Sequence, residues 1–431
     1  MTMSHLCLLG VATLTLTSAS FAGTDTNADL QARLEAAEAR INELSAATNN
    51  NWLNDARANE VRGLVHDVLA DADTRASLQG SGATAGYNGG FTIGSADGNW
   101  SMKINGLLQA RWIYEDSDDD DAFGTGVSTS WGFNTNRAYL TFSGTIAGDF
   151  GYSIRHDVTN SGGTATEEEW AWGSVGLGDG WSLRMGDMLV ANSRAQLIDS
   201  GNLMTLDRAE NWARNIGTGI SLDYVSDDIR AWIQLFNNAA VGALPTGTPA
   251  VGTANDSSSL ILGRVEFMVE GNWAQFDQIH SNAGDADGML FGLTYWTADG
   301  GDTDAAGSNT AVQADGNSSW TADVLCQWGG SSLYVGWTNF AHDTTAESDT
   351  DDLQAVFSMD LDDNWEAYVR FADQNDNLAT PALDGEVWSI GLNNYWAGQN
   401  AKWTIEVQWD DEHDAGDFDT TTIGSQLQFM F

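Results

Sequence analysis

Apolar and polar side chains alternate at every second residue from Trp100 to the end of the chain, and this pattern constrains the fold most. Successive side chains of a β-strand point to opposite sides, so the alternation predicts strands with one apolar and one polar face. In segment 100–114 the even-numbered positions are mostly apolar and the odd-numbered positions mostly polar. The same pattern recurs in segments 137–146, 150–157, 365–371 and 402–409.

Aromatic residues stand at the ends of these apolar faces: Trp365 and Phe371 flank one face, and Trp403 and Trp409 flank another. A bilayer interface favours aromatic rings at such positions, whereas the core of a soluble β-sandwich has no reason to place them there. Strands cross a bilayer only as a closed barrel, because every backbone hydrogen-bonding group must be paired in hydrocarbon. The sequence therefore predicts a transmembrane β-barrel.

The connections between the predicted strands alternate between short turns and long loops rich in Asp, Gly and Thr, as in bacterial outer-membrane barrels. Seventeen segments have strand character, but a bacterial single-chain barrel has an even number of strands. Segment 273–279 is too short and too weakly alternating to span the bilayer, which leaves 16 strands, and a further strand near 91–93 would raise the number to 18. We therefore expect an all-β protein, a 16-stranded antiparallel transmembrane β-barrel wide enough to enclose water.

The first 99 residues lack this regular alternation and divide into three predicted segments. Residues 1–22 are a predicted signal peptide with an apolar core over 6–16 and small residues near its end. Residues 23–80 are a predicted periplasmic helical segment, in which apolar residues between Leu30 and Leu44 recur with the spacing of a short coiled coil. This segment is either a surface helix or a coiled coil that supports trimerisation or reaches the cell wall. Residues 81–99 are a predicted Gly-rich linker leading into the barrel domain, which comprises residues 100–431.

Composition excludes several classes of function. The 61 acidic and 17 basic side chains leave a net charge of −44, which argues against nucleic acid as a partner. Cys7 leaves with the predicted signal peptide and Cys326 remains alone, so neither a disulfide nor a cysteine–histidine zinc site is expected. No catalytic motif is present, so we expect neither an enzyme nor a cofactor. The acidic run of Asp116 and residues 118–121 is predicted to be a solvated loop, with calcium binding as the alternative.

Three segments resemble the phosphate-selective porin O/P family of bacterial outer-membrane porins. They are 133–155, with Arg137 and a short turn before the next strand, 104–110, and Leu203-Met-Thr-Leu-Asp-Arg208. The terminal Phe431 agrees with them. The resemblance implies a 16-stranded barrel, a homotrimer, and a third external loop that folds inward to narrow the pore. The chain departs from the family in having Asn136 before Arg137, and it has only two lysines, so its solute preference stays open.

Basic residues on the polar faces of the predicted strands are candidates for the pore wall. One interpretation is a ladder that guides anions, and the other is that these arginines pair with Asp157, Asp207 and other carboxylates to brace the barrel. The predicted pore-lining residues are Lys103, Arg111, Arg137, Arg155, Arg184 and Arg370, and the predicted constriction-loop residues are Asp207, Arg208 and Arg214.

The expected function is an outer-membrane porin, a water-filled channel for passive diffusion of small hydrophilic solutes and ions, with anions such as phosphate among the candidates. Its expected surroundings are the lipids of the bacterial outer membrane. One alternative is a structural or adhesion barrel that tethers the cell envelope through its N-terminal coiled coil. Another is a secreted, Trp-rich β-sandwich that binds carbohydrate.

Overall fold

The computed structural model describes residues 27–49, 83–118, 127–159, 167–208, 216–237, 259–299, 318–342, 348–376, 385–412 and 418–431. The chain forms two compact units, Met1–Gly80 and Ser81–Phe431. In the first unit, helix α1 (Asn27–Asn49) confirms the predicted N-terminal helix, and its Leu34 and Ile41 side chains are exposed. The second amphipathic segment of residues 23–80, around residues 61–69, lies outside the described residues. Within the described ranges, no helix is long and apolar enough to cross a bilayer.

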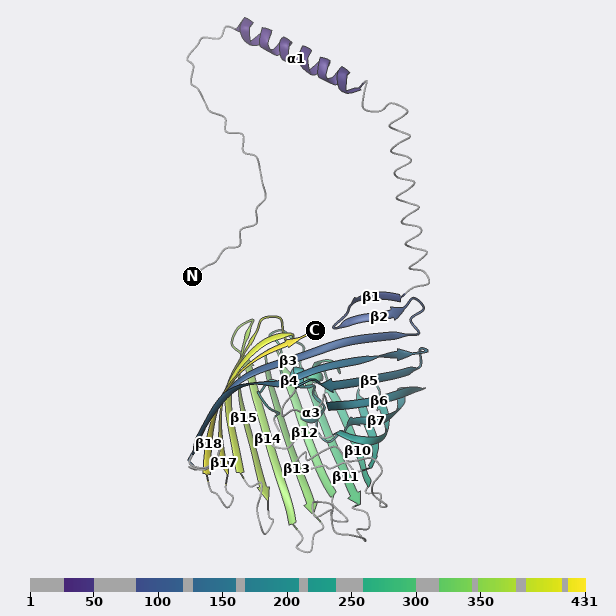
Figure 1. Ribbon diagram of the computed structural model, residues 1–431, viewed down its shortest axis with the longest axis vertical. Coiled ribbons are helices and arrows are strands. Elements are labelled where there is room, and N and C mark those ends of the chain that lie inside the picture. Colours follow the sequence, from purple (N-terminus) through teal and green to yellow (C-terminus); the bar gives the residue numbers. More distant parts are fainter. Residues whose placement is uncertain are drawn as a thin grey trace. The chain divides into compact units, whose positions relative to one another are not determined.

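The second unit consists mainly of antiparallel strands (Figure 1). Its first nine strands are β1 (Ala83–Tyr87), β2 (Phe91–Ser95), β3 (Ser101–Ser117), β4 (Thr129–Ile146), β5 (Phe150–Asp157), β6 (Glu167–Gly178), β7 (Trp181–Leu189), β8 (Ile216–Val225) and β9 (Ile229–Asn237). The others are β10 (Ser259–Glu270), β11 (Gly288–Asp299), β12 (Ser318–Trp328), β13 (Ser331–His342), β14 (Ser348–Asp360), β15 (Trp365–Asp376), β16 (Gly385–Tyr395), β17 (Ala401–Glu412) and β18 (Phe418–Met430). Short helices are α3 (Arg194–Leu197), η1 (Ser200–Asn202) and η2 (Gln275–Asp277).

Strands β3 to β18 form a closed ring, which confirms the predicted 16-stranded barrel within the described part of the chain. Each strand pairs with the next along the chain, and β18 pairs with β3 from Thr420↔Ser117 to Met430↔Leu107. Segment 273–279, which the parity argument removes from the strand list, contains the single turn η2 and no strand. Closure pairs the backbone of the first and last strands of the ring, so the sheet has no open edge for lipid to contact.

Within segment 81–99, expected to be a Gly-rich linker, residues 83–95 form the hairpin β1–β2, and β2 is the possible further strand near 91–93. Strand β2 pairs with the first residues of β3, from Phe91↔Ile104 to Gly94↔Ser101, beyond the end of β18. The hairpin therefore adds two strands outside the ring and does not make an 18-stranded barrel. Its attachment includes an aromatic contact, since the ring centroids of Phe91 and Phe431 are 5.8 Å apart.

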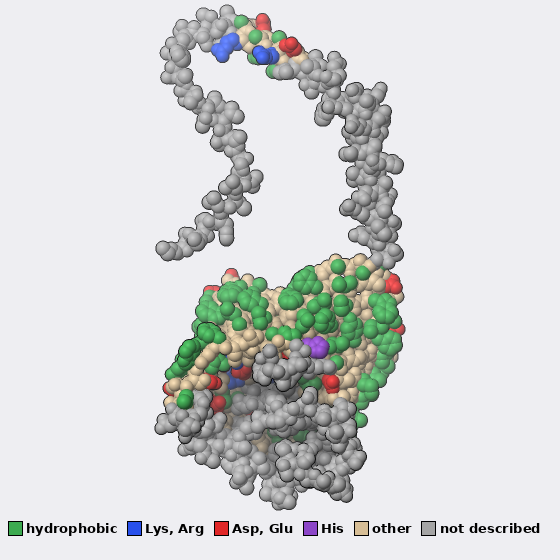
Figure 2. All heavy atoms as spheres, viewed as in Figure 1, with side chains coloured by type: hydrophobic (Ala, Val, Ile, Leu, Met, Phe, Trp, Pro, Cys, Tyr) green, Lys and Arg blue, Asp and Glu red, His purple; other side chains and the backbone are tan. Residues whose placement is uncertain are grey.

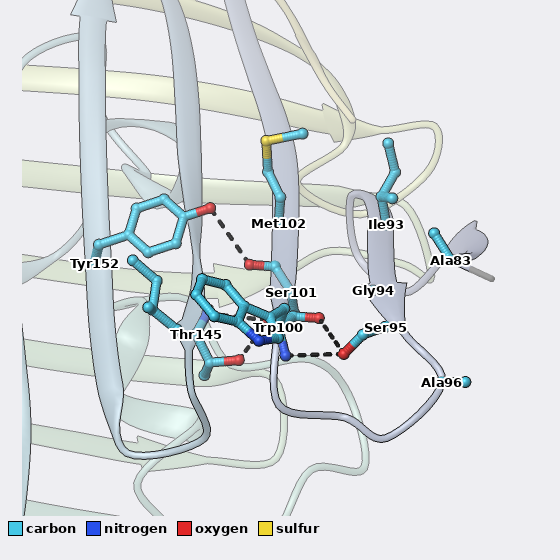
Figure 3. A pocket seen from close by; sticks show the side chains of 11 residues that line it. Ala83, Ile93, Gly94, Ser95, Ala96, Trp100, Ser101, Met102, Thr145 and Tyr152 are labelled. Atoms are coloured by element: carbon cyan, nitrogen blue, oxygen red, sulfur yellow. Dashed lines mark hydrogen bonds between the residues drawn. The ribbon is translucent and has the colours of Figure 1, made fainter. Parts of the chain in front are cut away.

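A hollow of about 510 Å³ lies between this hairpin and strands β3–β5 (Figure 3). Its rim is held by the Tyr152 hydroxyl, which donates to the Ser101 carbonyl at 3.3 Å, and by the Trp100 amide, which donates to Ser95 Oγ at 3.0 Å. The Trp100, Met102 and Tyr152 side chains give the hollow a largely apolar lining.

The apolar faces of the strands point outward and the polar faces point into the lumen, as the alternation predicts. On β12, Thr321 and Asp323 are buried inside, whereas Trp320 and Trp328 are exposed outside. Hydrophobic side chains accordingly cover much of the outer surface of the strands in Figure 2. This orientation fits a bilayer, because a charged side chain facing lipid at mid-depth would cost about 2–4 kcal/mol.

A bulge in β4 keeps this orientation across an irregular stretch of sequence. Gln109 pairs with Arg137, but the adjacent Ala110 pairs with Thr135, so Asn136 is the extra residue. Without the bulge, a one-residue slip would send the apolar side chains of one half of β4 into the lumen. The bulge therefore lets Trp131 and Phe133 stay on the outside while Arg137 points inward.

Two connections fold into the lumen and fill part of it. The inward loop, residues 190–208, follows β7 and is the third long loop, and the inward turn, residues 271–287, joins β10 to β11. Their apolar side chains pack together against the wall in one buried cluster that includes Leu203, Met204, Phe276 and Ile279. Asn202 Nδ2 also donates to the Asp277 carbonyl at 3.2 Å. Both segments therefore narrow the lumen. The resemblance to the porin family implies only the inward loop and not the inward turn.

Candidate functional site: the constricted lumen

Arg111 holds the tip of the inward loop against β3. Its Nη1 and Nη2 each lie 3.2 Å from an oxygen of Asp207, and Nη2 also donates to the Leu206 carbonyl at 2.6 Å. Arg137, on the neighbouring β4, lies 3.9 Å from the same carboxylate. Two guanidinium groups thus share one carboxylate, so Arg111, Arg137 and Asp207 together carry one excess positive charge.

Asp207 remains open to the lumen, with 53 % of its side chain exposed. Partial removal of Asp207 from water raises its pKa, because it favours the neutral acid. The positive charges of Arg111 and Arg137 lower the pKa by more, so it lies below its ordinary 3.8. Asp207 therefore carries its negative charge at neutral pH, beside the part of the lumen that solvent reaches.

Arg155 and Arg184 are paired with carboxylates on the wall and the loop. Arg155 lies 3.4 Å from Glu169 and 2.5 Å from Asp199, and its guanidinium stacks 3.8 Å over the Trp170 ring. Arg184 pairs with Asp223. These contacts are those expected of arginines that brace the barrel.

Arg208 and Arg370 fix the shape of the inward loop. Arg208 donates to the carbonyls of Ala195 and Ile198 at 2.9 and 2.8 Å, so it closes the loop on itself and is buried. Arg370, on β15, donates to the Arg208 carbonyl at 2.5 Å and thereby ties the loop to the wall. Both guanidinium groups are buried and do not face the open lumen.

Two other predicted residues do not join this group. Lys103 lies on the part of β3 that pairs with the β1–β2 hairpin, opposite Thr92, and not on the part that contacts the inward loop. Arg214 lies outside the described residues.

A buried ionic cluster on β10 and β12 was not among the predicted residues. Arg264 contacts Asp323 through two hydrogen bonds of 2.8 and 2.9 Å, and its Nη2 lies 2.8 Å from Glu266. Arg194, from α3 of the inward loop, lies 3.1 Å from Glu266. The alternation in segment 259–270 places positions 264 and 266 on one face, so this signal was available in the sequence.

Strands β16 and β17, close to β3 in the ring, also hold the inward loop near Leu206. Glu406 accepts from the Leu206 amide at 3.1 Å, and Asn393 Nδ2 donates to the Met204 carbonyl at 2.8 Å. Lys402 donates to the Leu203 carbonyl. The loop is therefore bound to the wall near β3 and β17 and, through Arg194 and Glu266, to the distant strand β10.

The exposure of the inward-facing side chains indicates which part of the lumen remains open. Inward side chains of β12, β14 and β16 are buried by the loop and the turn, whereas those of β4 and β7, such as Tyr139, Ser143 and Arg184, stay partly exposed. Among the described residues, the inward faces of β4 and β7 are therefore among the less buried, and Arg137 of β4 and the half-exposed Asp207 lie there.

The comparisons with known proteins agree with this architecture. The family described as phosphate-selective porin O and P matches residues 108–346, more than half of the chain. No curated protein matches the chain significantly.

Among solved structures, the chain is similar to the outer membrane channel DcaP of Acinetobacter baumannii, with a TM-score of 0.53 and 11% identity over 81% of this chain and 100% of that one. It is also similar to an anion-selective porin from Comamonas acidovorans, with a TM-score of 0.52 and 15% identity over 77% and 100%. A third similar structure is Salmonella typhi OmpF in complex with daunomycin, with a TM-score of 0.52 and 13% identity over 80% and 100%. The chain therefore belongs to the phosphate-selective porin O and P family and forms a channel for small solutes in the bacterial outer membrane.

Proposed function

We propose that this channel conducts small hydrophilic solutes and ions past the inner faces of β4 and β7 and prefers anions weakly. The observation that carries the proposal is the group of Arg111, Arg137 and Asp207, two cations sharing one half-exposed carboxylate at the tip of the inward loop. The excess positive charge faces the open path, where it attracts anions. The other predicted arginines, Arg155 and Arg184, are neutralised by their partners and brace the wall.

A reversal-potential measurement across a salt gradient tests this preference. We expect a small anion preference that Arg137→Ala weakens or reverses, because it removes the less tightly held of the two cations. Arg184→Ala is the matched control, since Arg184 is paired with Asp223 on the wall. Equal selectivity in the wild type and Arg137→Ala would contradict the proposal. Repeating the measurement with phosphate as the only anion tests whether phosphate passes.

We further propose that the mature protein is a homotrimer that acts by diffusion without catalysis. Residues 1–22 act as a cleaved signal peptide, and residues 23–80, with α1, form a periplasmic coiled coil. Family membership and the heptad-like spacing between Leu30 and Leu44 support these assignments. Native mass spectrometry of the full mature chain and of a form lacking residues 23–80 tests them, and a trimer that dissociates without this segment supports the coiled coil. A monomer in both cases would contradict the trimer.

A further inference from the structure

His280 lies on the inward turn, and its ring is bound on both sides. Nε2 lies 3.1 Å from Asn282 Oδ1, while Nδ1 lies 2.7 Å from Glu366 Oε1 and 3.8 Å from Asp360 Oδ1. Asp360 ends β14 and Glu366 lies near the start of β15, so three chain segments meet here. The three donor atoms all lie within 4.8 Å of one another.

The side-chain amide of Asn282 determines which nitrogen of the His280 ring carries a hydrogen. Asn282 Nδ2 donates to Asp285 Oδ2 at 2.9 Å, so Asn282 Oδ1 faces His280 and must accept from Nε2–H. In the neutral ring this leaves the lone pair of Nδ1 directed at two carboxylates. Acceptor facing acceptor at such short distances is repulsive, so a positive charge belongs between them: either a proton on Nδ1 or a metal ion.

Each carboxylate is oriented for such an ion by contacts to its other oxygen. Glu366 Oε2 accepts from Asn393 Nδ2 at 2.9 Å and from the Tyr395 hydroxyl at 2.6 Å, which leaves Oε1 toward His280. Asp360 Oδ2 accepts from the Ala283 amide at 2.8 Å, which leaves Oδ1 toward His280. Metal sites are commonly built this way, with hydrogen bonds to the outer atom of each ligand setting its direction.

The cluster also has access to solvent. A cavity of about 340 Å³ opens onto it, lined among others by His280, Asp360, Asp362 and Tyr395. Water can enter through it to complete the coordination of an ion, and the acidic lining favours cations. One imidazole nitrogen with two carboxylate oxygens suits zinc, which binds such ligands at about 2.0–2.2 Å.

We propose that His280, Asp360 and Glu366 bind a divalent transition-metal ion such as zinc, which links the inward turn to β14 and β15. The ion would join His280 to two strands of the wall and so keep the turn, with Phe276, inside the lumen. This site is independent of the ion preference proposed above, because none of its residues contacts Arg111, Arg137 or Asp207 through a described interaction.

Zinc titration of the full-length protein in detergent, after treatment with a chelator, tests the proposal. By calorimetry and elemental analysis we expect one tightly bound Zn²⁺ per chain, lost in His280→Ala and in Asp360→Asn. His156→Ala is the matched control, since this histidine lies on β5 away from the cluster, and it should bind zinc like the wild type. Asn282→Ala should weaken binding about 10–100-fold, the usual effect of removing an outer hydrogen bond.

X-ray absorption at the zinc edge provides a readout that does not depend on stability, and we expect one histidine nitrogen among oxygen ligands. Binding that persists unchanged in both His280→Ala and Asp360→Asn would place the zinc on the acidic loops and overturn the proposal. Absence of stoichiometric zinc in the folded wild type would overturn it as well and leave a proton between the three groups. If His280→Ala fails to assemble, Asp360→Asn, at a less buried position, decides.

Discussion

Arg111 and Asp207 join the wall of the barrel to the tip of the inward loop through two hydrogen bonds, each 3.2 Å long. A forked guanidinium that meets both oxygens of a carboxylate fixes orientation as well as distance. The same carboxylate is half exposed to the lumen, so one residue both positions the loop and contributes charge to the path.

Replacing Asp207 by Asn should raise the anion preference of the channel. The change removes the negative charge and leaves Arg111 and Arg137 uncompensated where the inward loop meets the wall. A unit charge about 4 Å from a passing ion changes its energy by about 1 kcal/mol in water-like surroundings, about fivefold in local occupancy. Reversal potentials at low salt, where screening is weakest, measure the effect. Asp223→Asn, beside Arg184 on the wall, is the control, and a smaller change for Asp207→Asn than for this control would count against the assignment.

The pH dependence of selectivity should distinguish Asp207 from other carboxylates. Its folded pKa lies below 3.8, so its charge and its contribution to stability are fully present above pH 3.8 and are lost as pH falls through the lowered value. The difference in reversal potential between the wild type and Asp207→Asn should therefore stay constant from neutral pH to about pH 4 and vanish only at more acidic pH. A difference that already disappears at pH 5–6 would contradict the lowered pKa.

The buried cluster of Arg264, Glu266 and Asp323 should be critical for stability. Removing one partner leaves a buried charge uncompensated, which typically costs about 3–5 kcal/mol. Glu266→Gln should therefore lower the free energy of unfolding by about this amount, measured with urea in lipid vesicles. Glu270→Gln, at the exposed end of the same strand, should change it little, and equal effects of the two variants would show that the cluster contributes no special stability.

A side chain at Gly106 should destabilise the barrel mildly, because this residue lies against the ring of the C-terminal residue. A Cβ at this position would meet the Phe431 ring, where β18 closes on β3. Because that ring is half exposed and can shift, Gly106→Ala should cost about 1 kcal/mol, the low end of the usual range for overpacking. The double variant Gly106→Ala/Phe431→Ala should recover most of that loss, as measured by unfolding in vesicles, and simple additivity of the two changes would exclude the proposed contact.

Much of the fold followed from the two-residue period, because the same alternation that separates lipid from water also decides where each side chain points. It placed Arg111 and Arg137 inside, and the parity of strands removed segment 273–279 correctly. Phe133 and Ala138 both lie on the apolar face but are five residues apart. Residues on one face of a regular strand are an even number apart, so this spacing indicates the bulge at Asn136.

The parts that the sequence did not predict depend on contacts between distant segments. Phe276 and Ile279 are apolar without a regular period, so nothing local indicates that they fold into the lumen and pack on Met204. Arg208 could be assigned to the loop, but its role in closing that loop depends on carbonyls whose positions only the folded chain defines. The possible strand near 91–93 corresponds to β2, but β1 and the hairpin outside the ring were not predicted, because β1 is short and rich in small residues.

We propose that water and ions pass through the lumen along the inner face of β4, and cysteine substitution combined with single-channel recording tests this path most directly. In a background with Cys7→Ser and Cys326→Ser, Ser143→Cys places a thiol on the inner face of β4 and Phe142→Cys places one on the outer face. We predict discrete conductance steps for both variants, with a charged, water-soluble thiol reagent reducing the steps of Ser143→Cys only. No conductance in the unmodified protein, or a block of Phe142→Cys instead, would contradict a water-filled path along β4.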